Sequence, residues 1–208
     1  MNTLLFLFFF LVMVPLSGFT RQFEFVVMGG YQFGGMVDET TQQEGVFTPG
    51  PALGLSGSGN WGVIADYRLG SKLLLELSFD RQPTTLNYHV PVGEHTEISP
   101  LSDITVDYYQ GGLLYDWSVT RLKPFAGGTV GIVVLTPSDE RYHSETHLAF
   151  AGLLGLRYFL TDAVALRLQG RFLLSKIPKG ELFFSNYTHH KETFMSQIQF
   201  GLGIDVAL

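Results

Sequence analysis

The chain has 208 residues, of which 46% are apolar and only 15% are charged, and its formal net charge is −6. Soluble domains carry about 25% charged residues, so this composition is unusually poor in charge. The acidic balance argues against a nucleic-acid binder, which needs a basic surface to contact phosphates. The absence of cysteine excludes a disulfide framework and thiolate chemistry.

The first segment has the pattern of a secretory signal. Residues 4–16 form an uninterrupted apolar stretch, which Ser17 and Gly18 follow. This stretch is shorter than the roughly 20 residues that a membrane-spanning helix needs. We therefore expect residues 1–20 to be a signal peptide that is cleaved at about residue 18–20, and residues 21–208 to form one mature domain. An uncleaved anchor or a buried first strand is the alternative.

Beyond residue 20, apolar residues recur at every second position. Near the C-terminus, Phe200, Leu202 and Ile204 alternate with Gln199 and Asp205. A period of two residues is the signature of a β-strand. The same test predicts eight strands, over residues 23–32, 60–68, 73–80, 103–117, 124–135, 147–158, 164–174 and 197–208. In the fourth of these the alternation shifts at residues 110–112, which predicts a β-bulge.

The connections between these strands alternate between short and long. Tight turns are expected over residues 69–72, 118–122 and 160–162, and long polar loops over residues 34–52, 82–102, 136–144 and 177–192. An even number of antiparallel strands with short turns at one end and long loops at the other is typical of a transmembrane β-barrel. The predicted fold class is therefore all-β: an eight-stranded antiparallel up-and-down transmembrane β-barrel, preceded by a signal peptide.

A soluble barrel such as a lipocalin is the alternative, and the polarity of the two strand faces separates the two. The charged face also carries the glycines and alanines that a narrow interior requires, whereas the other face is leucine, valine, isoleucine and aromatic residues. Because lipid tolerates no exposed charge, this pattern favours the membrane barrel. Aromatic residues near the strand ends predict two interfacial girdles. These are Tyr67, Tyr115, Trp117, Phe125 and Tyr158 toward the short turns, and Tyr31, Phe33, Trp61, Phe79 and Tyr108 toward the long loops.

The strand count, the loop asymmetry and glycine-rich strands such as residues 124–131 resemble the small eight-stranded outer-membrane barrels, among them the OmpA transmembrane domain, OmpX and OmpW. The resemblance covers the whole mature chain and includes no catalytic motif. It implies a monomer in the outer membrane of a diderm, Gram-negative-type bacterium, in contact with outer-membrane lipid and lipopolysaccharide. It also implies assembly by periplasmic chaperones and the barrel assembly machinery. The chain ends in Leu208, whereas such barrels usually end in phenylalanine or tryptophan.

The strand parity directs ten charged side chains into the lumen. They are Glu24, Asp66, Arg68, Glu76, Asp80, Asp116, Arg157, Arg167, Arg171 and Asp205. The interior of an eight-stranded barrel is just wide enough for side chains to fill. We therefore expect arginine–carboxylate pairs to form a connected network that closes the lumen. A narrow channel or an OmpW-like conduit for small apolar ligands, lined by Arg167 and Arg171, is the alternative.

With a closed lumen, function is expected in the structure of the barrel or in its four long loops, through adhesion or another surface interaction. Their composition identifies no extracellular ligand. His143, Glu145 and His147 are spaced at strand period and form a weak candidate for a metal site, with solvated rim residues as the alternative. No cofactor is predicted.

An enzyme that cleaves lipid would need a histidine and a serine close together on the lipid face, with a carboxylate to orient the histidine. His143 and Ser144 are adjacent, so in a strand they point to opposite faces. The sequence also lacks a phosphate-binding loop that leads into a helix. We therefore predict a barrel without enzymatic activity.

Overall fold

The computed structural model describes residues 22–43, 46–92, 95–117, 121–177, 180–181, 188–189 and 193–208. The expected signal peptide, residues 1–20, lies outside the described residues. The strands are β1 (Phe23–Phe33), β2 (Met36–Gln43), β3 (Val46–Leu55), β4 (Ser58–Arg68), β5 (Leu73–Val92), β6 (His95–Asp116), β7 (Leu122–Pro137), β8 (Glu145–Phe159), β9 (Val164–Ile177), β10 (Gly180–Glu181), β11 (Thr188–His189) and β12 (Thr193–Ala207). No helix in the described ranges is long and apolar enough to cross a bilayer.

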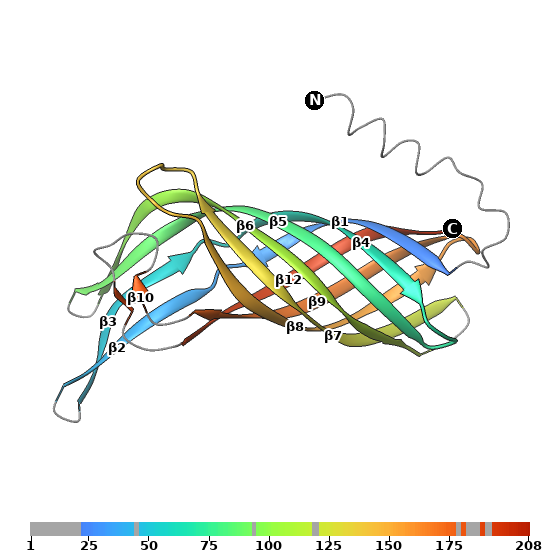
Figure 1. Ribbon diagram of the computed structural model, residues 1–208, viewed down its shortest axis with the longest axis horizontal. Coiled ribbons are helices and arrows are strands. Elements are labelled where there is room, and N and C mark those ends of the chain that lie inside the picture. The colour runs from blue at the N-terminus through green and yellow to red at the C-terminus, as the bar shows by residue number, and fades with distance from the viewer. Residues whose placement is uncertain are drawn as a thin grey trace.

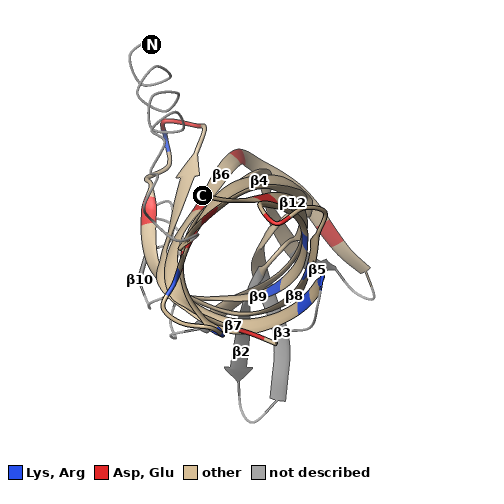
Figure 2. Cartoon of the chain, turned by 90° about the vertical axis from the view of Figure 1, so that its right-hand side faces the viewer, with Lys and Arg blue, Asp and Glu red and all other residues tan. Residues whose placement is uncertain are grey.

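Eight of these strands close into a ring of antiparallel pairs (Figures 1 and 2). Neighbours follow the order β5, β4, β1, β12, β9, β8, β7 and β6, and the pairing of β6 with β5 completes the ring. The first strand pairs with the last, from Glu24 opposite Ala207 to Phe33 opposite Ile198. The eight-stranded antiparallel barrel that the alternation predicted is confirmed.

The two faces of the strands differ in polarity as a membrane barrel requires. On β9, Leu166 and Leu168 are exposed, whereas Arg167 and Gln169 are buried in the interior. The outward apolar side chains form a continuous surface that we call the belt. Its members include Phe25, Val27, Tyr31, Trp61, Val63, Leu75, Leu77, Tyr109, Leu113, Val130, Ile132, Leu148, Phe150, Leu154, Leu156, Leu166, Leu168, Phe172, Ile198, Phe200, Leu202 and Ile204.

The bulge predicted at residues 110–112 is wrong. The pairing of β6 with β7 continues without a shift from Ile104 opposite Pro137 to Asp116 opposite Phe125. The apparent slip arises because the apolar face changes sides along β6. Leu113 lies on the outward face, whereas Ile104 and Val106, nearer the long loops, face inward. The backbone alternates regularly, and only the polarity inverts.

Two aromatic residues predicted for the girdles lie inside the barrel instead. Tyr108 and Phe125 are each 1% exposed. Tyr108 follows the inverted pattern of β6, and Phe125 packs among the charged side chains of the lumen, as described below. Sequence position near a strand end did not distinguish their faces, because an aromatic ring fits both a membrane interface and a closed interior.

Two of the four predicted long loops are largely β-structure. Residues 34–52 contain β2 and most of β3, and residues 82–102 contain the outer parts of β5 and β6. β5 and β6 pair as far as Val92 opposite His95, with one register shift between Leu86 and Asn87. Polar residues dominate these segments because a ribbon beyond the belt can face water on either side. Composition alone therefore predicted loops where the chain continues as strand.

β2 and β3 form a hairpin that projects from the ring at the end opposite the C-terminus (Figure 1). The hairpin joins the sheet through the pairing of Ala52–Leu55 with residues 86–89 of β5. The chain bends between β1 and β2 at Gly34, where a Cβ atom would lie 1.5 Å from the carbonyl oxygen of Leu55. Within the described residues, no pairing joins β2 to β12.

The remaining long connections are shorter than predicted or only partly described. β7 continues to Pro137, so the third connection covers residues 138–144. There the Arg141 guanidinium donates hydrogen bonds to Asp139, and this contact lowers the pKa of the Asp139 carboxyl to about 2. In the fourth, predicted over residues 177–192, Ile177 is the last residue of β9 and the two short strands β10 and β11 pair. Residues 178–179, 182–187 and 190–192 lie outside the described residues.

Two arginine substitutions, one within the belt and one beyond it, test which surface of the barrel meets lipid. Replacing Leu202, which lies in the belt and is 60% exposed, with arginine should destabilise the barrel by roughly 2–4 kcal/mol, because a cation is costly at the bilayer midplane. Ile98 is equally exposed at 59% but lies on the extension beyond the belt, so Ile98→Arg should be tolerated. Urea unfolding in lipid vesicles, followed by heat-modifiable gel migration, measures both. Equal stability of the two variants would contradict this assignment of the faces.

Candidate functional site

All ten charged residues predicted for the lumen project from the inward faces of the ring strands. Nine of them are buried, and Arg68 is half-buried at the end of the barrel that carries the short turns, which we call the short-turn end. They come from β1, β4, β5, β6, β8, β9 and β12. The structure brings them together in two groups, one nearer the short-turn end and one deeper in the barrel.

The first group centres on Arg157. Its guanidinium donates hydrogen bonds to Glu24 and to Asp116. Arg68 donates to the other oxygen of Glu24 at 2.5 Å and lies 3.5 Å from Asp116. Asp205 is the outlying member, because its Oδ2 atom lies 3.7 Å from Nη1 of Arg157. Two guanidinium groups thus bridge carboxylates from three strands, β1, β6 and β12.

The second group centres on Glu76, whose two oxygens accept from two different arginines. Nη2 of Arg167 lies 2.5 Å from Oε2, and Nη2 of Arg171 lies 2.8 Å from Oε1. Arg167 also donates to Asp66 at 2.7 Å, and Arg171 donates to Asp80 at 2.6 Å. Each guanidinium therefore joins two carboxylates, which uses the forked donor geometry of arginine.

Phe125 lies between the two groups. Its ring centroid is 5.3 Å from the guanidinium carbon of Arg157 and 4.6 Å from that of Arg167. Both distances fall within the range of cation–π attraction. The ring therefore fills the space between two like charges with a surface that attracts both. We refer to the two groups together with Phe125 as the inner network.

The inner network is acidic, with six carboxylates against four guanidinium groups. Oδ1 of Asp66 and Oδ2 of Asp205 accept no hydrogen bond from the described residues. Burying charges costs several kcal/mol per ion, and removing one partner costs more, because it leaves a buried charge uncompensated. The charged members consequently couple seven strands, Phe125 on β7 adds the eighth, and all depend on one another.

Above the inner network lies a layer of neutral polar side chains. Tyr108 donates to Oε1 of Gln197 at 2.5 Å, and Gln197 donates to Oε1 of Gln82 at 3.2 Å. Gln82 in turn donates to the backbone carbonyl of Gln32. Gln82 and Tyr108 were missed from the sequence. The signal was present for Gln82, which shares the parity of Glu76 and Asp80 but was placed in a loop.

Beyond this layer, toward the long loops, the interior is apolar. The buried side chains there are Leu53, Leu55, Leu86, Ile104, Val106, Val133, Leu135, Ala149, Ala151, Leu173, Ile177 and Met195, and Tyr108 borders them. The alternation in the sequence did not predict this cluster, which we call the outer core. The inner network, the neutral polar layer and the outer core thus follow one another along the barrel. Two smaller apolar clusters are also buried, one of Leu74, Leu114, Phe125 and Leu153 and one of Val26, Met28 and Ile64.

The structure brings together only two of the three residues of the weak candidate metal site, His143, Glu145 and His147. Oε2 of Glu145 lies 2.7 Å from Nε2 of His147, whereas His143 precedes the start of β8 and is exposed. Across the described ranges, no three histidine, aspartate or glutamate side chains come together as metal ligands would. The structure thus pairs two of the three residues and leaves the third apart.

Several solved structures are similar to this fold. Outer membrane protein OprG from Pseudomonas aeruginosa superposes with a TM-score of 0.58 at 14% identity, covering 89% of this chain and 95% of that chain. Neisserial surface protein A gives 0.56 at 14% identity, over 88% and 97%. The E. coli outer membrane protein W gives 0.50 at 10% identity, over 91% and 100%. No protein-family model and no curated protein sequence matches the chain.

These similarities concern the fold. The belt and the closed ring define the same fold without reference to these comparisons. Each of the three proteins is an outer membrane or surface protein by its own description, and each aligns over nearly its full length. The chain therefore has the fold of the small eight-stranded outer-membrane β-barrel proteins.

Proposed function

We propose that the protein is an integral outer-membrane barrel with an interior closed to ions, which acts structurally or through the surface that it presents beyond the belt. One observation carries the proposal: side chains fill the interior, from the inner network through the neutral layer to the outer core. A continuous file of water would have to displace paired charges at one level and packed apolar side chains at another. We also propose contact with outer-membrane lipid and lipopolysaccharide, and assembly by periplasmic chaperones and the barrel assembly machinery.

The surface proposed for interaction is the extension of β5 and β6 beyond the belt. Residues 95–100 at its tip are all exposed, and Ile98 among them is a large apolar residue. Such a ribbon on a rigid barrel is suited to binding a macromolecule. We propose no catalytic role for the barrel.

A conduit for small apolar molecules is the second candidate. It is favoured by the outer core, which is an apolar interior, and by the unpaired neighbouring edges of β2 and β12 among the described residues. An apolar molecule in the outer core would meet the polar layer and the inner network below it. It would therefore have to leave sideways, between those two edges.

The closed interior predicts the electrical behaviour of the barrel. Purified protein inserted into a planar lipid bilayer should give no stable conductance, because the inner network occupies the cross-section with paired charges. A stable, ion-selective current from the unmodified protein would contradict the proposal and favour a channel.

The inner network also predicts a large loss of stability on removing one arginine. Arg167→Ala should destabilise the barrel by roughly 3–5 kcal/mol, because Asp66 and Glu76 would remain as buried carboxylates without that partner. Arg141→Ala, which removes an arginine from an exposed ion pair, is the matched control and should leave stability unchanged. Urea titration in vesicles measures both. If Arg167→Ala unfolded at the same urea concentration as the wild type, the network would not hold the barrel closed.

The closed barrel and the conduit predict different results in an uptake assay. A conduit predicts that cells carrying the protein take up an apolar fluorophore faster than cells without it. Ala149→Phe, which fills the outer core, should abolish this gain, and Leu148→Phe, on the outward face of the same strand, should not. If the wild-type protein gives no gain, only the closed barrel remains.

A further inference from the structure

The outward face of the barrel carries an open groove of about 540 Å³. Its central residues are direct cross-strand partners in one row, namely Phe25, Ala65, Leu77, Gly111 and Val130. The row crosses β1, β4, β5, β6 and β7 within the belt. Ala65 and Gly111 have little or no side chain, so the surface is hollow where larger residues flank them. Binding pockets for small ligands have volumes of roughly 300–1,000 Å³.

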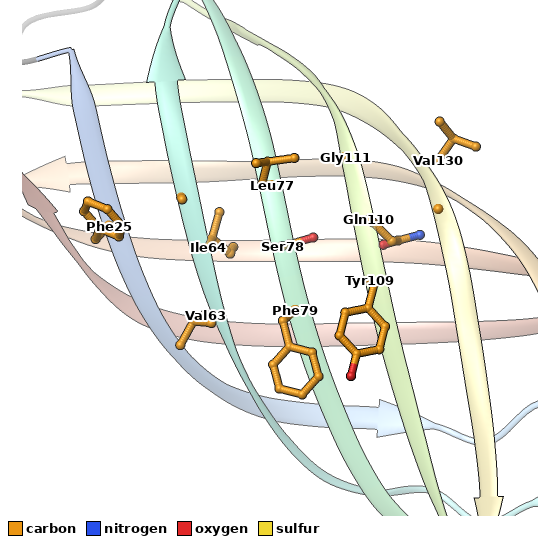
Figure 3. A pocket seen from close by; sticks show the side chains of 12 residues that line it. Phe25, Val63, Ile64, Leu77, Ser78, Phe79, Tyr109, Gln110, Gly111 and Val130 are labelled. Atoms are coloured by element: carbon orange, nitrogen blue, oxygen red, sulfur yellow. The ribbon is translucent and has the colours of Figure 1, made fainter. Parts of the chain in front are cut away.

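The next row toward the long loops forms a wall of this groove. Phe79 and Tyr109 are direct partners on β5 and β6, and their ring centroids lie 5.1 Å apart. Figure 3 shows the two rings beside each other, with Leu77 and Val63 nearby and no side chain at Gly111. The groove therefore has a floor of small residues and an apolar, aromatic wall.

A charged pair lies directly beyond this wall. Arg81 and Asp107 are the next outward-facing partners on the same two strands, about 7 Å beyond Phe79 and Tyr109. Nε and Nη2 of Arg81 each donate to Asp107 at 2.7 Å. The Arg81 side chain is 44% exposed and covers Asp107, which is nearly buried. Asp107 thus fixes the guanidinium, and Nη1 is the nitrogen that donates no hydrogen bond to the described residues.

We propose that this groove binds one acyl chain of a phosphate-bearing membrane lipid, whose phosphate accepts a hydrogen bond from Arg81. The groove lies in the belt, where lipid hydrocarbon is the surrounding solvent. The guanidinium stands at the edge of the belt, where headgroups begin. A lipid with an acyl chain and a phosphate matches both features, the apolar groove within the belt and the cation beyond its aromatic wall. The inference goes beyond the proposed function and rests on it only in placing the barrel in a bilayer.

A substitution that places a larger side chain in the groove tests whether the groove binds an acyl chain. In Gly111→Leu the new Cβ would lie 3.2 Å from the flexible end of Leu77, so the barrel should still fold. Gly152→Leu is the matched control, because Gly152 lies on the outward face of β8 and its Cβ would meet nothing within 4 Å. Heat-modifiable migration establishes that each variant is folded, which separates failure of the site from failure of the barrel. Native mass spectrometry then measures binding of phosphatidylglycerol and of diacylglycerol with the same acyl chains.

The wild type and Gly152→Leu should each hold one phosphatidylglycerol. Gly111→Leu should bind it about tenfold more weakly, which corresponds to losing the burial of about two methylene groups. Diacylglycerol should bind the wild type more weakly than phosphatidylglycerol, and Arg81→Gln should remove that difference. Equal binding of phosphatidylglycerol by Gly111→Leu and the wild type would overturn the site. Equal binding of the two lipids by the wild type would also overturn the site. A dimer of the wild type that Gly111→Leu dissociates would overturn it too, because the occupant of the groove would then be a second copy of the chain.

Discussion

Closure of the sheet is the constraint on which the rest of this structure depends. A strand surrounded by hydrocarbon can satisfy its backbone polar groups only by pairing along both edges. The ring meets this requirement where β1 pairs with β12 and where β5 pairs with β6. A ring of eight strands leaves an interior that side chains fill. Every inward residue must therefore fit against its neighbours, and every inward charge must find a partner.

The inner network follows from that confinement. A narrow interior cannot hydrate ten charged groups separately, so their forked donors and acceptors must satisfy one another. Glu76 on β5 shows how this links the barrel, because it accepts from Arg167 and Arg171 on β9. These arginines also reach Asp66 on β4 and Asp80 on β5. A one-residue slip of any strand would turn its charges toward lipid. The same contacts that fill the interior therefore favour a single register for the strands.

The sequence was informative where the bilayer imposes a period and uninformative where it does not. Within the belt, lipid selects apolar residues on one face, so the parity of Arg167 and Leu168 sufficed to predict their faces. Parity also directed the ten charged residues into the interior, although it did not predict which of them pair, because pairing depends on how the strands curl around the ring. Gln82 and the strand around Leu86 were assigned to a loop, because beyond the belt the outward face meets water and the alternation that lipid imposes does not continue. Tyr108 and Phe125 were misplaced because an aromatic ring is compatible with either face.

The change of polarity along a single strand explains why the outer core lies at the end of the interior away from the inner network. On β5, Leu77 faces lipid and Glu76 faces the interior, whereas farther along Leu86 is buried and its neighbour Thr85 lies toward solvent. β6 repeats this pattern, with Leu113 outward and Ile104 inward. Lipid surrounds the first part of each strand and water surrounds the second, so the apolar face must change sides at the edge of the belt. The outer core is accordingly the ordinary hydrophobic core of a water-exposed extension, built on the same strands as an inverted membrane barrel. The outer core is therefore explained without an apolar ligand. For this reason we favour the closed barrel over the conduit as the proposed function.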